Sequence, residues 1–245
     1  MCELRSLRLA LLFAAAASLL FGLPAASQSR KPVYQVPKTT TAIQIDGNLD
    51  DVSWSTAPAV TLVQNRDGSP APYPTEARLL YDDQYLYFAF RCKDENIWAT
   101  MKQRDEHLWM EEVVEVFVQG DPAHSSYIEL EVNPLNAMID IFLLDIRKPI
   151  PYATWNSARL RWNVQVKGTV DGRPGDQEWT CEMALPHEEV VTALHLPPRA
   201  GDRWRVNLYR IDQKPKKILL AWSPTLKDDF HVPSMFGEIV FGAGR

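Results

Sequence analysis

The clearest pattern in the chain is a strict alternation of hydrophobic and polar positions in several short runs. In residues 114–118, Val114, Val116 and Val118 fall on one side of an extended chain, whereas Glu115 and Phe117 fall on the other. A period of two is typical of a strand whose two faces meet different surroundings. Residues 127–133 alternate in the same way, and we expect these two strands to pair.

Short turns join most of the other strand-like runs in pairs, which predicts hairpins. Two short helical segments are expected, one near residues 52–57 and one at residues 186–194, and residues 28–41 form a polar lead-in. The remaining predicted strands are residues 43–47, 75–81, 85–92, 137–144, 158–170, 177–185, 203–212, 218–222 and 237–241.

About ten strands with hairpin connections and one or two short helices describe an all-β fold, an antiparallel β-sandwich of the jelly-roll or immunoglobulin-like kind. Residues 28–245 contain no linker rich in Gly, Ser or Pro, and no internal repeat. We therefore expect them to form a single domain.

The first 27 residues have the pattern of a signal peptide. Arg5 and Arg8 precede a short apolar run, and small residues at 25–27 provide a cleavage site. This predicts export to the periplasm, the cell surface or the medium, and no membrane partner for the mature chain. Such a compartment allows Cys92 and Cys181 to pair, but two separate core thiols fit the pattern equally well.

Composition narrows the classes of ligand. The net charge is −5 and the basic residues are scattered, which argues against nucleic acid as a partner. Eight tryptophans and eight tyrosines favour a carbohydrate, because the apolar faces of a sugar ring stack on aromatic side chains. Most of these rings are nevertheless expected to lie in the core.

Three kinds of chemistry remain as alternatives. Glutamates at 111, 112, 115, 129 and 131 could provide the two carboxylates of a glycan-active hydrolase, although a solvated sheet face explains the same pattern more simply. The loop pair Asp82 and Asp83 could bind a structural calcium ion, although turn chemistry also explains it. A haem or redox sandwich would pair a methionine with a histidine, and no spacing favours any such pair.

Four motifs resemble carbohydrate-binding module family 9, in the order in which that family has them. They are IDGNLDDVSW at residues 45–54, YDDQYLY at 81–87, WMEEVVEVF at 109–117, and WS at 222–223 with PSMFG at 233–237. The resemblance implies a β-sandwich that binds sugars, often at chain ends and often with structural calcium.

The resemblance also implies roles for particular residues. Trp109 matches one wall of the family's aromatic clamp and Glu115 matches its sugar-binding carboxylate. Phe230 is the nearest match to the opposite wall, where the family has a tryptophan. Glu131 stands where the family has an arginine, and the family's late-loop asparagine falls near Lys227 or Asp228.

The leading hypothesis is an exported, non-catalytic carbohydrate-binding protein with no catalytic residues, accessory to polysaccharide uptake or degradation. Its sugar would stack between Trp109 and Phe230 and hydrogen-bond to Glu115. The remaining candidates for the rim of the site are Arg104, Glu131, Asp228 and His231.

Overall fold

The computed structural model describes residues 31–144 and 155–244 of the 245-residue chain. The segment predicted as a signal peptide lies outside the described residues, and so do residues 145–154, between the strands predicted at 137–144 and 158–170. Lys31–Arg245 form one compact unit. No helix among the described residues is long and apolar enough to cross a membrane.

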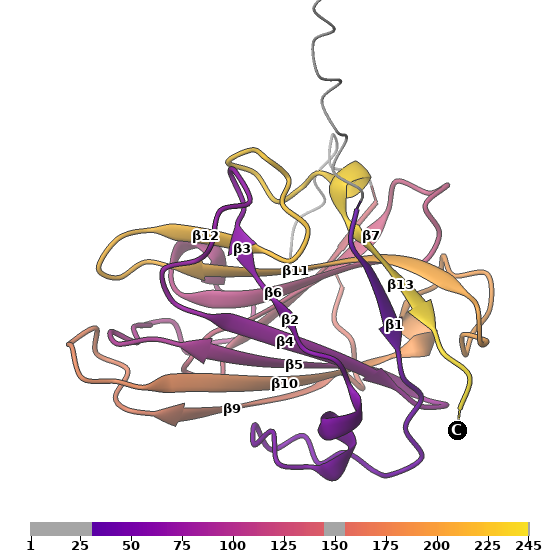
Figure 1. The fold of residues 1–245 in the computed structure, drawn as a ribbon, viewed down its shortest axis with the longest axis horizontal. Helices are drawn as coiled ribbons and strands as arrows, with labels where there is room; N and C mark the ends of the chain where they lie inside the picture. The colour runs from indigo at the N-terminus through magenta and orange to yellow at the C-terminus, as the bar shows by residue number, and fades with distance from the viewer. Residues whose placement is uncertain (1–30, 145–154, 245) are drawn as a thin grey trace, which may run out of the picture. The chain divides into compact units, whose positions relative to one another are not determined.

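The fold is a sandwich of two sheets, as predicted (Figure 1). The larger sheet has the order β1-β13-β11-β6-β7-β8, with β12 and then β3 added beside β11, and the smaller sheet has the order β2-β4-β5-β10-β9. The strands of the described residues are β1 (Val33–Val36), β2 (Val60–Thr61), β3 (Val63–Gln64), β4 (Thr75–Tyr81), β5 (Tyr85–Lys93), β6 (Val113–Gln119), β7 (Tyr127–Val132), β8 (Met138–Leu143), β9 (Arg161–Lys167), β10 (Glu178–Pro186), β11 (Arg203–Asp212), β12 (Ile218–Ala221) and β13 (Gly237–Phe241).

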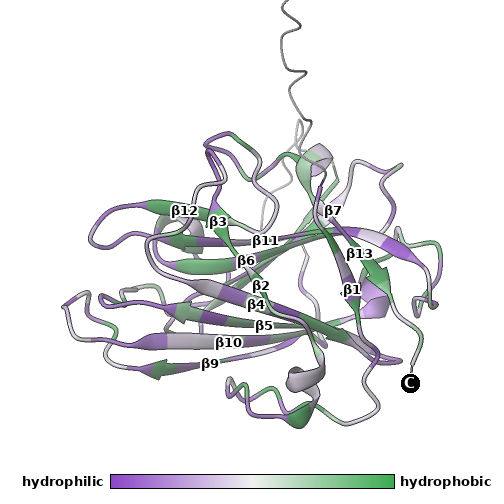
Figure 2. Cartoon of the chain, viewed as in Figure 1, coloured by the Kyte–Doolittle hydropathy of each residue, from purple (hydrophilic) through white to green (hydrophobic). Residues whose placement is uncertain are grey.

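The main core lies between the two sheets. Val114, Val116 and Val118 of β6 point into it, together with alternate residues of β5 and β10 such as Phe88 and Met183. Bands of hydrophobic residues therefore run along the strands of both sheets (Figure 2). The sheet faces turned toward this core are called inner below, and the opposite faces are called outer.

Helical structure is limited to short 3-10 turns. In η1 (Val52–Thr56), Trp54 is buried and its indole N–H donates to Glu182 at 2.7 Å, so that this turn covers part of the outer face of the smaller sheet. The other 3-10 turns of the described residues are η2 (Leu108–Met110), η4 (His187–Glu189) and η5 (Pro233–Met235).

The helix predicted over residues 186–194 is wrong, because only η4 forms there. The side chain of His187 is buried, and its Nε2 hydrogen-bonds the carbonyl oxygen of Asp82 at 3.0 Å. This hydrogen bond fixes the chain against the turn between β4 and β5, so the helical structure ends after η4.

Two differences concern the first strands. Residues 43–47 form no strand, since the backbone N–H groups of Asp46 and Gly47 donate to the carboxylate of Glu182 instead of to a neighbouring strand. The predicted lead-in contains β1, which pairs in parallel with β13. Among the paired strands of the described residues, β1 and β13 form the parallel pair and the other pairs are antiparallel.

Cys92 and Cys181 are free, buried thiols on the neighbouring strands β5 and β10. Both belong to the main core. Of the two alternatives that the sequence left open, the structure has the separate core thiols.

Candidate functional site

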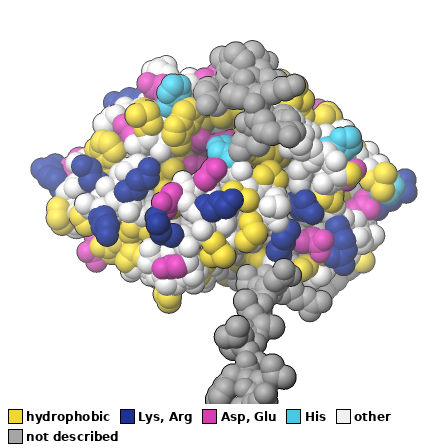
Figure 3. Space-filling model, turned by 90° about the horizontal axis from the view of Figure 1, so that it is seen from above, with side chains coloured by type: hydrophobic (Ala, Val, Ile, Leu, Met, Phe, Trp, Pro, Cys, Tyr) yellow, Lys and Arg dark blue, Asp and Glu magenta, His cyan; other side chains and the backbone are white. Residues whose placement is uncertain are grey.

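The candidate site lies on the outer face of the larger sheet. Alternation along β6 turns Glu115 and Phe117 away from the main core, and the pairing of β6 with β7 places Glu131 directly opposite Glu115, and Glu129 directly opposite Phe117. All four side chains therefore share one face. Figure 3 looks down on this side and shows acidic and histidine side chains near its middle, among hydrophobic ones.

The three glutamates of this face, Glu115, Glu129 and Glu131, form a close group that we call the carboxylate trio. One oxygen from each lies within 4.8 Å of the others. Their exposed fractions are only 2, 4 and 0 %. The interpretation of these residues as a solvated sheet face is therefore wrong, because aromatic and aliphatic side chains cover them.

The trio contains polar atoms without a partner. Among the described residues, Oε1 of Glu115, Oε2 of Glu129 and both oxygens of Glu131 accept no hydrogen bond. An unsatisfied buried polar group costs about 1 to 3 kcal/mol, and more when it is charged. A ligand that donates hydrogen bonds or carries positive charge would remove this cost.

Burial and mutual repulsion raise the pKa values of the trio. Burial raises the pKa of Glu115 well above its usual value, and the charge of Glu129 raises it further. Burial has the same effect on Glu131, with Glu115 and then Glu129 adding to it. The pKa of Glu129 is also raised by burial, although His231 partly opposes the shift.

A group of aromatic rings surrounds the trio. Phe230 lies flat on Tyr209, with the ring centroids 4.0 Å apart and an interplanar angle of 14°. Tyr209 is in turn the cross-strand partner of Glu115 from β11. Phe117 stacks on Tyr127 at 5.5 Å and meets Phe236 edge-on. These rings belong to one apolar cluster, separate from the main core.

Trp109 packs against this same aromatic cluster. It lies in η2, just before β6, and is only partly buried. Its ring stacks on His107, with centroids 4.5 Å apart. The structure thus brings Trp109, Glu115, Phe230 and Glu131 to one face.

His231 also lies at this face. Its Nδ1 is 2.6 Å from the hydroxyl of Tyr127 and 3.9 Å from Oε2 of Glu129. Its ring packs over Phe117 at 5.2 Å. The prediction of His231 as a rim residue is compatible with this position.

Arg104 and Asp228 are held elsewhere. Arg104 donates to Asp140 at 2.5 Å and to Asn156 at 2.6 Å. Asp140 alternates with Ile139 along β8, so its side chain points away from the outer-face cluster. Asp228 is exposed and pairs with Arg66. The structure does not bring either residue to the carboxylate trio.

Asp82 and Asp83 make the bonds expected of a turn. Asp82 accepts hydrogen bonds from the backbone N–H groups of Gln84 and Tyr85 and from the hydroxyl of Tyr87. Asp83 pairs with Lys38 at 2.6 Å. Among the described residues, neither belongs to a group of three potential metal ligands, so calcium at this turn remains a prediction.

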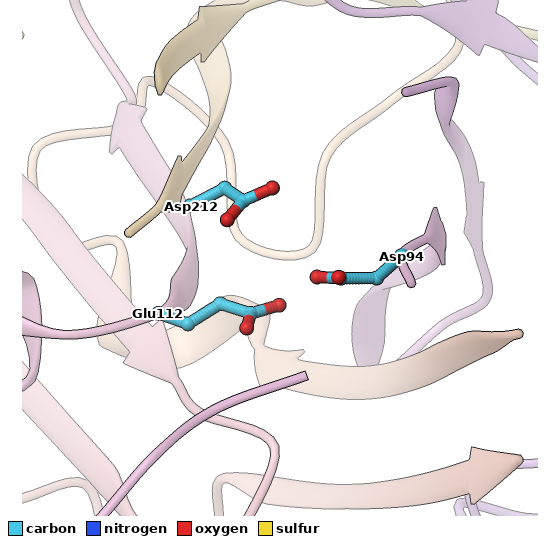
Figure 4. A group of neighbouring side chains, drawn as sticks. All are labelled: Asp94, Glu112 and Asp212. Carbon is cyan, nitrogen blue, oxygen red and sulfur yellow. The ribbon is translucent and has the colours of Figure 1, made fainter. Parts of the chain in front are cut away.

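A second acidic group, Asp94, Glu112 and Asp212, lies at the ends of strands, with its carboxylates turned toward a common centre (Figure 4). The guanidinium of Arg210 contacts all three, at 2.5, 3.1 and 3.3 Å respectively. All four side chains are almost completely buried. This group therefore carries its own cation.

Hydrogen bonds complete the Arg210 group. Glu112 also accepts the indole N–H of Trp179 at 2.6 Å and the backbone N–H of Trp98 at 3.0 Å. Burial raises the pKa of Asp212 to about 6, although Arg210 opposes the shift. The group connects β11 of the larger sheet to β5 and β10 of the smaller sheet. We therefore assign it a structural role.

A glycoside hydrolase holds two carboxyl groups across a scissile bond, where substrate and water reach both of them. The trio instead gathers three buried carboxylates of one sheet face within 4.8 Å of one another. The arrangement is better suited to binding than to catalysis.

The sequence reasoning placed Tyr127 on the same side as Glu129 and Glu131 but did not name it as a site residue, and it missed Tyr209 altogether. The alternation of residues 203–212 could have identified Tyr209, because Asn207, Tyr209 and Ile211 fall on the side opposite Val206 and Leu208. Only the pairing of β11 with β6 shows that this side adjoins Glu115.

A hollow of about 460 Å³ lies on the outer face of the smaller sheet, away from the trio. It is lined by residues of η1 and the segment before it, and by alternate residues of β4 and β5, including Asp50, Arg78 and Arg91. Its lining is mainly polar and charged. Trp54 is the aromatic residue among those lining it.

Comparisons with known proteins agree with this fold. The family model for carbohydrate-binding family 9 matches residues 48–241. Among curated protein sequences, none matches the chain significantly.

Solved structures share the fold at low sequence identity. A protein of Bacteroides uniformis ATCC 8492 to which carbohydrate binding is ascribed has a TM-score of 0.72 and 18% identity, over 86% of this chain and 100% of that one. A family 9 module from Caldicellulosiruptor kristjanssonii in complex with cellotriose has a TM-score of 0.60 and 15% identity, over 88% and 95%. A family 9 module from Caldicellulosiruptor kristjanssonii in complex with glucose has a TM-score of 0.59 and 16% identity, over 87% of this chain and 96% of that one.

Proposed function

Because the chain belongs to carbohydrate-binding family 9, we propose that it is a non-catalytic protein that binds a sugar at the outer face of its larger sheet. The proposal rests on one observation, which is that Trp109, Phe230 and Glu115 lie on the same face. Both rings pack in the outer-face cluster, and Glu115 rises from the strand at its centre.

The chemistry of this face matches the chemistry of a sugar ring. The C–H faces of a pyranose pack against aromatic rings, and its hydroxyl groups donate hydrogen bonds to carboxylates. Trp109 provides the stacking surface and Phe230 the facing wall. Oε1 of Glu115 has no partner among the described residues and would accept a hydroxyl hydrogen.

The replacement of the family's arginine by Glu131 changes what the site can hold. A carboxylate at this position accepts hydrogen bonds but donates none unless it is protonated. The site is therefore rich in acceptors, and it favours a sugar that presents several hydroxyl donors on one edge. Glucose and cellotriose, the ligands of the two structurally similar modules, present such edges.

We further propose that the protein is exported and serves the uptake or degradation of polysaccharides. The support is the N-terminal sequence pattern, since residues 1–27 carry a basic start, an apolar run and a small-residue cleavage site. N-terminal sequencing of the protein secreted by an expressing bacterium tests this. A mature chain that begins near Gln28 is expected, and full-length protein retained inside the cell would contradict it.

Isothermal titration tests the sugar site. We expect binding heat with glucose, with cellotriose or with another soluble oligosaccharide, and loss of that heat in Trp109→Ala. Trp98→Ala is the matched control, because Trp98 is partly buried but contacts Lys214 rather than the outer-face cluster. No heat with any sugar, or equal heat for both variants and the wild type, would contradict the proposal.

A further inference from the structure

We propose that Glu115, Glu129 and Glu131 bind one hard divalent cation, and that calcium is the ion that fits them best. This inference goes beyond the proposed function, because it concerns a second ligand and can be tested without a sugar. It shares Glu115 and Glu131 with the proposed sugar site, whereas Glu129 belongs to the cation site alone.

The positions of the three oxygens fit one ion. Calcium binds oxygen ligands at about 2.3 to 2.6 Å, so ligands on opposite sides of it lie about 4.6 to 5.2 Å apart. The three carboxylate oxygens of the trio lie within 4.8 Å of one another. All of them can therefore contact the same ion without movement of the strands.

The unpartnered oxygens point to a ligand. Glu131 is fully buried, and neither of its oxygens has a donor at full hydrogen-bond geometry among the described residues, although the backbone N–H of Trp109 and the carboxyl group of Glu129 lie close enough to influence its pKa. Glu115 and Glu129 each contribute one more such oxygen to the same group. Buried carboxylates are normally paired or bound to a metal, and here no partner within the described chain fills that place.

The second acidic group of this protein provides the comparison. Asp94, Glu112 and Asp212 form a buried group of the same size, and the guanidinium of Arg210 contacts each of them. Within residues 31–144 and 155–244, no arginine contacts the carboxylate trio in this way. The same electrostatic requirement is therefore met by a side chain in one group, and it is left for a bound cation in the other.

The nearby basic residues do not take this place. His231 is 3.9 Å from Glu129, and its Nδ1 is engaged with the hydroxyl of Tyr127. Lys217 influences Glu115 electrostatically, but its side chain is exposed. Neither residue forms an ion pair with Glu115 or Glu131 among the described residues.

The ligand atoms select the class of ion. Three carboxylates are hard oxygen ligands, which suit calcium, magnesium and manganese rather than zinc or copper. Magnesium requires oxygens at about 2.0 to 2.1 Å and retains several waters, which a closed, largely apolar surrounding opposes. Calcium accepts longer and less regular coordination, and therefore fits the trio better.

Titration of the metal-free full-length protein tests the inference. After treatment with EDTA and dialysis, calcium chloride is added without sugar, and binding is followed by calorimetry and by terbium luminescence sensitised by neighbouring tyrosine and tryptophan rings. We expect one site per chain and a higher thermal unfolding midpoint with calcium. Glu131→Gln and Glu129→Gln should each weaken binding at least tenfold.

Glu188→Gln is the matched control, because Glu188 is exposed and pairs with Arg159 at the surface. It should bind calcium as the wild type does. Circular dichroism checks that the variants of the trio remain folded, and replacement of Glu by Gln keeps the size of the side chain. Unchanged calcium binding in both folded variants of the trio would overturn the inference.

Absence of binding by the wild type to calcium, manganese and terbium would also overturn it. Sugar binding by the EDTA-treated protein that shows no cation binding would leave the proposed function intact and remove only this inference. Cation binding with no response to any sugar would support this inference and contradict the proposed function.

Discussion

Glu115 and Glu131 are direct cross-strand partners on β6 and β7, and both carboxylates are buried. Like charges opposite each other destabilise a sheet, so this pair is retained at a cost in stability. Together with Glu129, it forms the floor of the face that carries Trp109 and Phe230. This relationship joins the sugar-binding proposal to the cation-binding proposal.

Glu115→Gln should weaken sugar binding about tenfold or more, because a hydrogen bond to a charged group contributes about 1.5 to 3 kcal/mol. Titration with the sugar that gives the largest heat measures the effect. Glu188→Gln, at the exposed surface, should keep the wild-type affinity. Equal affinities of the two variants would show that Glu115 makes no sugar contact.

Arg210→Met should destabilise the protein by about 3 to 5 kcal/mol. The substitution leaves Asp94, Glu112 and Asp212 as buried carboxylates without a cation, and removal of one partner from a buried ion pair costs about this much. Urea unfolding at pH 7 measures the change, with Arg203→Met, at an exposed pair with Glu238, as the control. A loss below about 1 kcal/mol would contradict the structural role of this group.

His187 should make the fold sensitive to acid. Burial among Tyr81, Trp204 and Phe241 lowers the pKa of His187 below its usual 6.5. Between the usual and the lowered value, the unfolded chain binds a proton that the folded chain does not bind. The stabilising contribution is therefore present above about pH 6.5 and is lost as the pH falls through the folded-state pKa.

Urea unfolding of His187→Gln between pH 5 and pH 7.5 checks this expectation. The variant should show a smaller loss of stability on acidification than the wild type. His124→Gln, at an exposed histidine, should follow the wild type. A pH dependence that is identical in all three proteins would rule out the contribution of His187.

Cys92 and Cys181 should not react with iodoacetamide in the native protein. Both are buried, and burial raises the pKa of Cys92 to about 12 and that of Cys181 well above its usual value. The thiolate is the reactive form. Mass spectrometry should find both alkylated only after unfolding without a reductant, whereas alkylation that requires a reductant would show a disulfide.

Much of the fold could be predicted from the sequence because most strands contain their own alternation. The bounds of β11 and β13 and the hairpin of β4 and β5 follow from such runs. β1, β2 and β3 have only two to four residues, too few for a period of two to be recognised. Their pairing depends on partners distant in the sequence, which local patterns do not show.

The candidate site was only partly predictable, for a similar reason. Alternation placed Glu115 opposite the valines of β6, but it could not show whether that side faced water. Burial of the carboxylates depends on rings from other elements, such as Tyr209 and Phe230. Arg104 lies near η2 in sequence, yet Asp140 draws its side chain to another side of the sheet.

A crystal structure of the protein with its best-binding sugar tests the central claim most directly. The account predicts sugar density on the outer face of the larger sheet, with the ring against Trp109 and a hydroxyl within about 3 Å of Glu115. Sugar density in the hollow beside Arg78 and Arg91 on the smaller sheet, with the face of Trp109 empty, would contradict it.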